Sequence, residues 1–259
     1  MTENVLSGAE PFFYEGNEGN EGNEGNKIGV VVSHGFTGTT QSMRFLGKTL
    51  AEEGGFTVSG PRLKGHGTTP EEMAQSTAED WIRSVEGAMR DLQTCCDKIF
   101  ITGLSMGGTL TLYIAGMYPD LIAGAIPINA AVFLHSPDFA RLAFMKDAPA
   151  MVPGVGSDIK KPGVTELAYE QMPVRAVREL YALMGATHDL LGSIACPTLV
   201  FQSKDDHVVN PQNAPFIMEH LTVEDKRLIW LEESYHVATL DNDKELIAEE
   251  TLKFIQAHV

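Results

Sequence analysis

The sequence has few cysteines and no recognisable leader segment. Only three cysteines occur in 259 residues, at Cys95, Cys96 and Cys196. This odd number, with two adjacent residues, matches no zinc site or disulfide framework, so we expect reduced, mostly buried thiols. The first residues carry neither a basic end nor an apolar segment, and no apolar run approaches about 18 residues. These absences predict a cytoplasmic protein without a membrane-spanning segment.

Positive charge is also scarce. The 19 Lys and Arg residues are outnumbered by 35 Asp and Glu, which gives a formal net charge of -16 and a pI near 4.8. The negative electrostatic field of such a protein repels nucleic acid and anionic membrane surfaces but is compatible with a neutral small-molecule substrate. The length and the 43% hydrophobic content suit one large core with an insertion. They leave open whether the chain is a monomer or a homodimer.

One segment has low complexity. Residues 15–26 spell Glu-Gly-Asn four times and offer no apolar side chain to a core, so we expect a flexible loop there. The flanking runs at 11–14 and 28–32 have the composition of strands. We therefore predict that the repeat is the loop of an extended hairpin, and we favour a tolerated surface expansion over a functional role.

Elsewhere, short apolar runs alternate with segments of helical periodicity. The predicted strands are 28–33, 56–59, 98–102, 121–126, 197–203 and 227–232. The predicted helices are 41–53, 78–96, 108–115, 211–221 and 244–258. This alternation predicts a doubly wound, mostly parallel α/β sheet whose catalytic groups gather at the carboxyl ends of the strands.

The alternation stops between about residues 131 and 191. Prolines and short helical pieces, predicted at 165–169 and 174–184, replace it. We interpret 131–191 as a helical cap inserted into a core formed by 1–130 and 192–259; an ordinary helical packing layer is compatible with the same pattern. Eight apolar residues are available to line a pocket beneath the cap: Phe133, Leu134, Phe139, Leu142, Phe144, Met145, Met151 and Val152.

The stretch Gly-Leu-Ser-Met-Gly at 103–107 lies between an apolar strand and a helix. A serine at such a corner has a strained backbone, and Gly103 and Gly107 supply the small neighbours that the corner needs. The hydroxyl of Ser105 would then be exposed, and the amide of Met106 would point into the same space at the positive end of the helix. The pattern predicts a nucleophile elbow, although this five-residue motif alone is common by chance.

A serine nucleophile needs a base and an acid that orients the base. Of the eight histidines, His236 is the one in the loop after the final predicted strand, and an imidazole suits proton transfer at neutral pH. Asp206 fits the orienting acid, and Asp205 is its competitor. The order Ser, Asp, His is that of α/β-hydrolases. This chemistry needs no metal ion and no cofactor.

An oxyanion hole needs a second main-chain donor besides Met106. The loop 34–40, which follows the strand 28–33, contains two glycines and small polar residues, so we predict the amide of Phe36 as that donor. We place His34 and Gly35 in contact with the substrate; a plain connection between a strand and a helix is the alternative. His66, in the rigid loop 61–67, is interpreted as structural.

Four motifs together resemble the bacterial monoacylglycerol lipase and carboxylesterase group of the α/β-hydrolase superfamily. They are His-Gly-Phe-Thr-Gly at 34–38, Pro-Arg-Leu-Lys-Gly-His-Gly at 61–67, Gly-Leu-Ser-Met-Gly-Gly at 103–108 and Ser-Tyr-His-Val-Ala-Thr-Leu-Asp at 234–241. The resemblance runs from about Pro11 to the C-terminus. It implies Ser105 as nucleophile, Asp206 as acid, His236 as base, and the Phe36 and Met106 amides as oxyanion hole.

The same resemblance favours Asp206 over Asp205, because the group's pattern has the acid three residues after Ser203. The segment 155–170 is similar to the monoacylglycerol lipase subgroup, which implies Val155 and Glu166 as substrate-binding residues. For Glu166, a solvated helix residue is the alternative. The Glu-Gly-Asn repeat departs from the group's pattern and touches no catalytic residue.

We therefore expect a serine hydrolase that cleaves carboxylic esters through an acyl-enzyme. A capped pocket favours monoacylglycerols or other single-chain esters. The alternatives are a general short-chain carboxylesterase and a hydrolase of monoesters of aromatic diacids. A non-enzymatic binding protein with the same fold is a rival of another class, and the intact set of Ser105, Asp206 and His236 argues against it.

Overall fold

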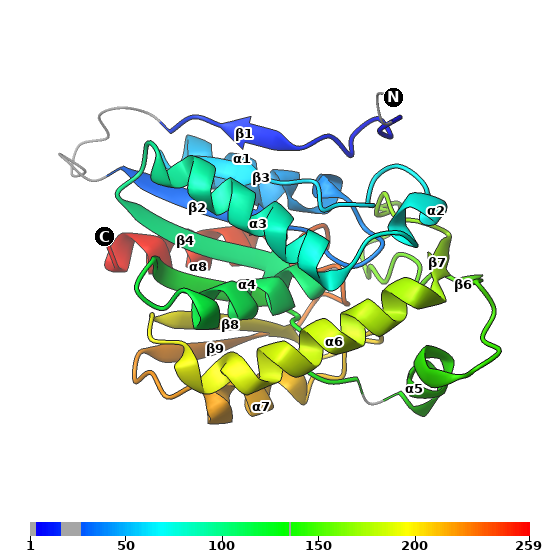
Figure 1. Cartoon of the computed structure of the whole chain (residues 1–259). Coiled ribbons are helices and arrows are strands. Elements are labelled where there is room, and N and C mark those ends of the chain that lie inside the picture. Colours follow the sequence, from blue (N-terminus) through cyan, green and yellow to red (C-terminus); the bar gives the residue numbers. More distant parts are fainter. Residues whose placement is uncertain (1–3, 17–26, 135) are drawn as a thin grey trace.

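A seven-stranded sheet forms the centre of the molecule (Figure 1). The computed structural model describes residues 4–16, 27–134 and 136–259, so the predicted flexibility of the repeat falls almost wholly outside the described residues. The strand order is β1-β3-β2-β4-β5-β8-β9. These strands are β1 (Phe12–Tyr14), β2 (Ile28–Ser33), β3 (Thr57–Gly60), β4 (Lys98–Leu104), β5 (Ile122–Ile128), β8 (Thr198–Ser203) and β9 (Lys226–Leu231).

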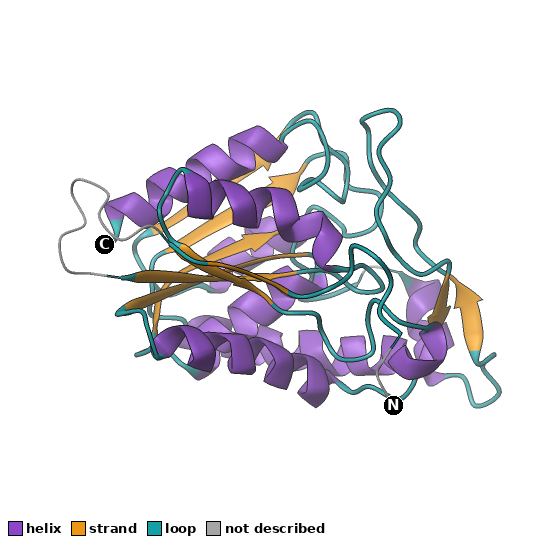
Figure 2. Ribbon diagram, turned by 90° about the horizontal axis from the view of Figure 1, so that it is seen from above, coloured by secondary structure: helices purple, strands orange, loops and turns teal. Residues whose placement is uncertain are grey.

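Helices cover both faces of this sheet (Figures 1 and 2). One face carries α1 (Arg44–Glu52) and α8 (Lys244–Ala257). The other face carries α3 (Ala78–Gln93), α4 (Met106–Met117), α6 (Val174–Leu190) and α7 (Asn213–His220). Three further helices are short: η1 (Thr40–Met43), α2 (Pro70–Met73) and η2 (Leu191–Ser193).

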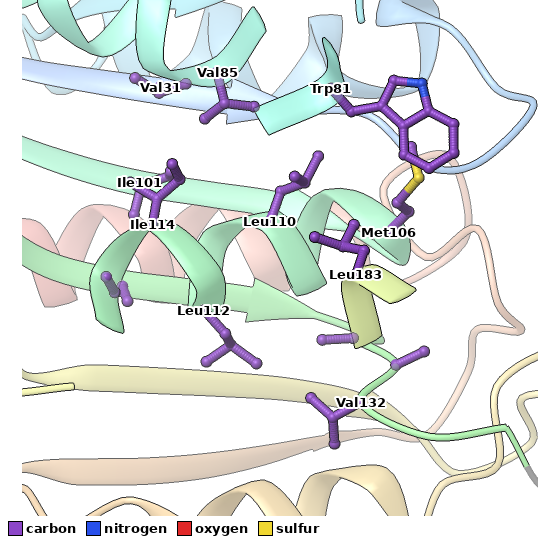
Figure 3. Close-up of a cluster of buried hydrophobic side chains, with 14 of the residues drawn as sticks. Val31, Trp81, Val85, Ile101, Met106, Leu110, Leu112, Ile114, Val132 and Leu183 are labelled. Carbon is purple, nitrogen blue, oxygen red and sulfur yellow. The ribbon is translucent and has the colours of Figure 1, made fainter. Parts of the chain in front are cut away.

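The inner strands are largely apolar because both of their faces are covered. In β4, Ile99 and Ile101 join the hydrophobic cluster under α3 and α4, whereas Phe100 and Leu104 join the cluster under α1 and α8. Successive side chains of a strand point to opposite faces, so a strand between two helical layers has apolar residues at most positions on both faces. Figure 3 shows part of the first cluster, with Trp81 and Leu110 among its members.

The predicted fold class is confirmed. β2, β3, β4, β5, β8 and β9 pair in parallel, and β1 is antiparallel to β3. Outside residues 131–191 each predicted strand and helix is found, with its ends shifted by a few residues. The carboxyl ends of the parallel strands lie at one edge of the sheet, where ligands bind in open α/β sheets.

The predicted hairpin between β1 and β2 is wrong. β2 pairs with β3 on one side and with β4 on the other, so neither of its edges is free for β1, which pairs with the outer edge of β3. There Phe12 packs in space that glycine provides: a methyl group on Gly60 would lie 2.3 Å from the Phe12 ring, and one on Gly47 would lie 2.7 Å from it. Burial of Phe12 at these two glycines stabilises the observed pairing.

The segment predicted as a cap divides into two parts. α5 (Pro137–Phe144) and the antiparallel strands β6 (Met151–Pro153) and β7 (Gln171–Pro173) lie beyond the carboxyl ends of the central strands (Figure 1). α6 instead runs back along α4, so closely that a methyl group on Gly116 would lie 2.9 Å from the Cβ of Leu190. The second part thus belongs to the helical layer on the sheet, as the alternative interpretation has it.

Of the two helical pieces predicted in this segment, one is confirmed and one is wrong. The helix predicted at 174–184 is α6, which continues to Leu190. Residues 165–169 are irregular instead of helical. Their main-chain N–H groups donate away from the segment, from Leu167 to the side chain of Gln41 (3.1 Å) and from Tyr169 to the carbonyl of Thr37 (3.0 Å). These long-range bonds replace the local bonds of a helix.

Candidate active site

Ser105 lies at the corner between β4 and α4 in a strained conformation. Its φ is 58° and its ψ is -119°, a region that non-glycine residues seldom occupy. Its N–H donates to the carbonyl of Ile128 in β5 at 2.8 Å. A methyl group on Gly103 would lie 2.4 Å from the carbonyl oxygen of Gly107, and one on Gly107 would lie 2.2 Å from that of Ser33. The corner therefore requires glycine at both predicted positions.

Asp206 and His236 form a buried pair. Nδ1 of His236 is 2.8 Å from Oδ2 of Asp206, and their side chains are 8% and 0% exposed. The other oxygen of Asp206 accepts from the N–H groups of Val208 (2.9 Å) and Val209 (2.8 Å). These bonds fix the carboxylate, which in turn holds the imidazole proton on Nδ1. Nε2 then carries the lone pair that a base needs.

The surroundings of His236 favour its protonated form. Burial lowers the pKa of His236, but the charge of Asp206 and its hydrogen bond raise it, and the charges of Glu166 and Asp158 add to that effect. The net result is a pKa above the ordinary value of 6.5. A base with a raised pKa accepts a proton more readily during nucleophilic attack.

The structure brings Ser105, Asp206 and His236 together on the wall of one cavity of about 750 Å³. Asp205, the competing acid, is exposed and lies outside this wall. The hydrogen bond to His236 thus comes from the residue that the family resemblance favours.

The loop after β2 forms the wall beside Ser105. Gly35, Phe36 and Thr37 line the cavity together with Met106. Met106 is the first residue of α4, so its N–H has no partner inside the helix and lies at the positive end of the helix dipole. Gly35 approaches Ser105 closely, because a methyl group on it would lie 3.2 Å from the Cβ of Ser105.

His34 lies behind this loop, so its prediction as a substrate contact is wrong. It is fully buried and is absent from the cavity wall. The N–H of Leu63 donates to its Nε2 (3.1 Å), which leaves Nδ1 to donate to the carbonyl of Gly35 (3.0 Å). Burial lowers the pKa of His34 to about 4, so the ring is neutral. Its role is to support the loop, and the buried His66 packs against it with ring centroids 5.1 Å apart.

The remaining wall is largely apolar and comes from residues 131–180. Of the eight apolar residues predicted to line a pocket, Leu134, Phe139, Leu142 and Val152 do so. Phe144 and Met145 are 75% and 45% exposed, Phe133 packs on Phe216, and Met151 lies in β6 and does not line the cavity. Val155 lies on the cavity wall and is 39% exposed.

Glu166 is a carboxylic acid on this apolar wall. It lines the cavity and is partly accessible, and its Oε1 lies so near the loop 34–40 that a methyl group on Gly38 would be 2.5 Å from it. Burial raises the pKa of Glu166 to about 7, although the charge of His236 and a hydrogen bond with Ser42 lower it. Glu166 is therefore neither helical nor directed into bulk solvent.

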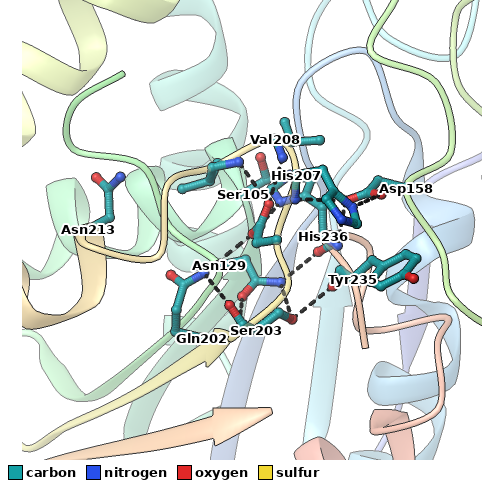
Figure 4. A network of polar contacts seen from close by, with 12 residues as sticks. Ser105, Asn129, Asp158, Gln202, Ser203, His207, Val208, Asn213, Tyr235 and His236 are labelled. Atoms are coloured by element: carbon teal, nitrogen blue, oxygen red, sulfur yellow. Dashed lines mark hydrogen bonds and ion pairs between the residues drawn. The ribbon is translucent and has the colours of Figure 1, made fainter. Parts of the chain in front are cut away.

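The sequence analysis missed two polar residues near the pair, Asn129 and Asp158 (Figure 4). Asn129, which follows β5, donates to the hydroxyl of Ser203 and to the carbonyl of His236. Asp158 accepts from main-chain N–H groups of two loops. A polar residue at the carboxyl end of a strand is a signal that could have identified Asn129. Asp158 has no such signal, because its partners are 49 and 78 positions away.

Two kinds of feature are absent from residues 4–16, 27–134 and 136–259. No cluster of three or more His, Cys, Asp or Glu residues in these ranges has a geometry that could hold a metal ion. No helix there combines the length and apolar character needed to cross a bilayer. The three cysteines are free thiols; Cys96 and Cys196 are buried as predicted, and Cys95 is exposed.

Comparison with known proteins identifies relatives along almost the whole chain. The chain is 46% identical to a thermostable monoacylglycerol lipase from a Bacillus species, over 98% of this chain and 97% of the relative. It is 30% identical to a carboxylesterase from Bacillus subtilis, over 95% and 96% of the two chains.

Solved structures agree with the observed fold. A metagenome-derived lipolytic enzyme superimposes with a TM-score of 0.93 at 54% identity, covering 98% of this chain and 100% of that chain. The monoacylglycerol lipase of Paleococcus ferrophilus, at 19% identity and a TM-score of 0.79 over 96% and 98% of the chains, shares the fold. A model of the family described as serine aminopeptidase, S33, matches residues 25–243. The chain therefore has the α/β-hydrolase fold and belongs to the serine aminopeptidase S33 family.

Proposed function

We propose that the protein hydrolyses carboxylic esters, above all monoacylglycerols or other single-chain esters, through an acyl-enzyme. One observation carries this proposal: Ser105 at a strained corner and a His236 held by Asp206 line the same, largely apolar cavity. A binding protein would have no need for the strain at Ser105 or for the buried charge at Asp206. The relatives named lipase and carboxylesterase support the same class of reaction.

In the first half of the proposed reaction, Ser105 Oγ attacks the ester carbonyl carbon while its proton passes to Nε2 of His236. The Asp206 carboxylate stabilises the resulting imidazolium through Nδ1. The amides of Phe36 and Met106 donate to the oxyanion, each with a typical contribution of about 10²–10³ in rate. The intermediate collapses as the C–O bond to the alcohol breaks, and His236 protonates the departing alcohol oxygen.

In the second half, water replaces the alcohol. His236 removes a proton from the water as it attacks the acyl carbon, and the same two amides hold the second oxyanion. The bond to Ser105 Oγ then breaks, His236 returns its proton to that oxygen, and the fatty acid leaves. No electron transfer occurs, and the protein regains its starting protonation state.

The proposed substrate follows from the cavity wall. An acyl chain fits against Leu134, Phe139 and Val152. Glu166 and Val155 are proposed contacts for the alcohol portion, because a carboxyl group can bind two glycerol hydroxyls at once. Gly35 leaves room for the ester group beside Ser105. A general short-chain carboxylesterase is the second candidate, favoured by the relative of that name.

We further propose that the insertion at residues 131–191 covers this site through its first part, residues 131–173, and that the protein is located in the cytoplasm. The insertion and the location are expectations from the sequence. The position of α5, β6 and β7 beyond the carboxyl ends of the strands supports the first (Figure 1).

The test is a panel of esters that vary the acyl part and the alcohol part separately. For one acid, kcat/KM is compared between the monoacylglycerol and the ethyl ester in wild type and in Glu166→Ala. An unpaired hydroxyl in a dry pocket costs about 1–3 kcal/mol, so the variant should lose about tenfold or more on the monoacylglycerol and little on the ethyl ester.

The matched control is Glu170→Ala, which removes an exposed carboxylate from the same segment and should change neither substrate. Equal losses of Glu166→Ala on both esters would favour the general carboxylesterase. A wild type that hydrolyses none of the panel would refute the proposed function.

A further inference from the structure

The carboxylate of Asp158 lies between the loop that carries Asp206 and the loop that carries His236. Asp158 follows β6, and its side chain is 15% exposed. Its Oδ2 accepts from the main-chain N–H groups of His236 (3.1 Å) and His207 (3.2 Å). Its Oδ1 lies 2.8 Å from Nδ1 of His207. Figure 4 shows Asp158 beside these two histidines.

These contacts fix the main chain on both sides of the catalytic hydrogen bond. His207 is adjacent in sequence to Asp206, and the carbonyl of Asp158 also accepts from the N–H of Val237 (3.0 Å), the neighbour of His236. We infer that Asp158 is a positioning residue for the Asp206–His236 pair: it sets the relative position of the two loops and adds a negative charge beside His236. This inference rests on the proposed function.

The segment that carries Asp158 is itself attached to the His236 loop. The buried carboxylate of Asp241 accepts from the N–H groups of Lys160 (2.7 Å) and Lys161 (2.9 Å). It also accepts from the N–H of Tyr235 (2.9 Å), the residue before His236. Movement of Asp158 away from the histidines would break these bonds as well, and buried unpaired groups are costly. This part of the chain is therefore a fixed support for the site.

The charge of Asp158 gives a readout that a purely structural residue would not have. The charged groups that face His236 are all carboxylates: Asp206, Glu166 and Asp158. Each of them favours the protonated imidazole and so raises the pKa of His236. The groups that face His207 are Asp158, Asp206 and Asp205, and the hydrogen bond to Asp158 is the main cause of the raised pKa of His207. Removal of the Asp158 charge should therefore lower the pKa of His236.

The experiment compares wild type with Asp158→Asn, which keeps the shape and one oxygen acceptor but removes the charge. The kcat for a water-soluble nitrophenyl ester should fall about 10- to 100-fold, because small displacements of catalytic groups have effects of this size. KM should change less than twofold, since Asp158 does not line the cavity. The acid limb of the kcat/KM profile should move to lower pH. His207→Gln should reproduce part of the fall in kcat, because it removes one of the three contacts. It should not move the acid limb to lower pH, because the charge of Asp158 remains.

Glu233→Gln is the matched control, since Glu233 is a carboxylate on the loop that carries His236, is 66% exposed and pairs with Lys160. It should leave kcat and the acid limb unchanged. Titration of Ser105 with a phosphonate ester gives the number of competent sites, so kcat can be expressed per site. An unchanged kcat per site in Asp158→Asn, or an acid limb at the wild-type pH, would overturn the inference.

A measurement without substrate separates this inference from the proposed function. The proton between His236 and Asp206 should give a low-field NMR resonance in wild type, and it should shift or exchange faster in Asp158→Asn and Asp158→Ala but not in Glu233→Gln. This result would support the positioning role even if the wild type hydrolysed no ester. An identical resonance in all four proteins would refute the role.

Discussion

The side chain of Asn129 donates a hydrogen bond of 2.7 Å to the main-chain carbonyl of His236. Its other contacts go to Ser203, whose N–H donates to Oδ1 (2.7 Å) and whose hydroxyl accepts from Nδ2 (3.1 Å). The hydroxyl of Ser203 donates onward to the carbonyl of Tyr235 (2.8 Å). The buried amide thus joins the ends of β5 and β8 to the loop that carries His236 (Figure 4).

The first prediction concerns this amide. Asn129→Ala leaves the N–H of Ser203 and the carbonyl of His236 without their partner, at about 1–3 kcal/mol for each buried group. We expect a lower melting temperature and a kcat reduced about tenfold or more, because His236 would no longer be fixed. Asn242→Ala is the control: Asn242 is exposed and makes one side-chain bond in the same loop. Equal effects of the two variants would contradict a specific role for Asn129.

The second prediction tests the nucleophile. Ser105→Ala should remove ester hydrolysis, with a loss of about 10⁶ in turnover as in other serine hydrolases. The fold should persist, since alanine is smaller than serine and keeps the main-chain hydrogen bond to Ile128 that holds the corner. Circular dichroism and a thermal melt check the fold, and hydrolysis of a nitrophenyl ester checks the activity. Retention of more than a few per cent of the activity in pure protein would place the nucleophile elsewhere.

The third prediction separates two adjacent acids. Asp206→Asn reverses the donor and acceptor roles at Nδ1 of His236, so kcat should fall by orders of magnitude, about 10⁴ in the best-studied triad. Asp205→Asn should have a mild effect, because Asp205 is exposed and away from the cavity. The two kinetic losses are measured at the same pH. The opposite ranking would show that the hydrogen bond between Asp206 and His236 is not the functional one.

Patterns local in sequence predicted much of this structure. The run 28–33 is apolar at nearly every position because β2 lies between two helical layers, and that burial is visible without knowledge of its neighbours. The corner at Ser105 could also be predicted, because any such corner makes close contacts that require glycine at positions such as Gly103 and Gly107. His236 could be chosen because it follows the last strand, a position that topology alone defines.

Other features depend on partners that the sequence does not indicate. The edge that β1 joins is decided by the space that Gly47 and Gly60 leave for Phe12. The segment 165–169 has helical composition. Its main-chain hydrogen bonds to Gln41 and Thr37 override that preference, and both partners lie over a hundred positions away in the sequence. The wrong role for His34 has a similar cause. The sequence shows that a histidine begins the loop 34–40, but it does not show that the side chain is buried behind the loop and away from the cavity.

The fourth prediction concerns the Glu-Gly-Asn repeat, residues 17–26 of which are outside the described structure. Reduction of its four units to one should change the melting temperature little, because the entropy of loop closure depends only logarithmically on loop length. β1 supports the same expectation, since it is held by β3 and not by a turn to β2. A large fall in melting temperature would mean that the repeat packs on the folded body.

The fifth prediction follows from the carboxyl group of Glu166. Burial raises the pKa of Glu166 from the ordinary 4.5 to about 7, so the folded state keeps this proton between those pH values while the unfolded state releases it. By linkage, this group stabilises the protonated folded state at low pH, and the free energy of unfolding declines as the pH rises toward 7. Above pH 7 the ionised carboxylate is present in both states, and the full penalty of its burial remains.

Glu166→Gln replaces this group by a neutral one of the same shape. The substitution should raise the melting temperature more at pH 8 than at pH 5, with a gain in unfolding free energy of up to about 3 kcal/mol at the higher pH, at 1.36 kcal/mol for each unit of pKa. Glu170→Gln, at an exposed position, should give the same small change at both pH values. Thermal melts of the three proteins at the two pH values provide the measurement. If the gain of Glu166→Gln were equal at pH 5 and pH 8, the carboxyl group of Glu166 would be hydrated in the folded protein, and the dry polar contact proposed for the glycerol hydroxyls would lose its basis.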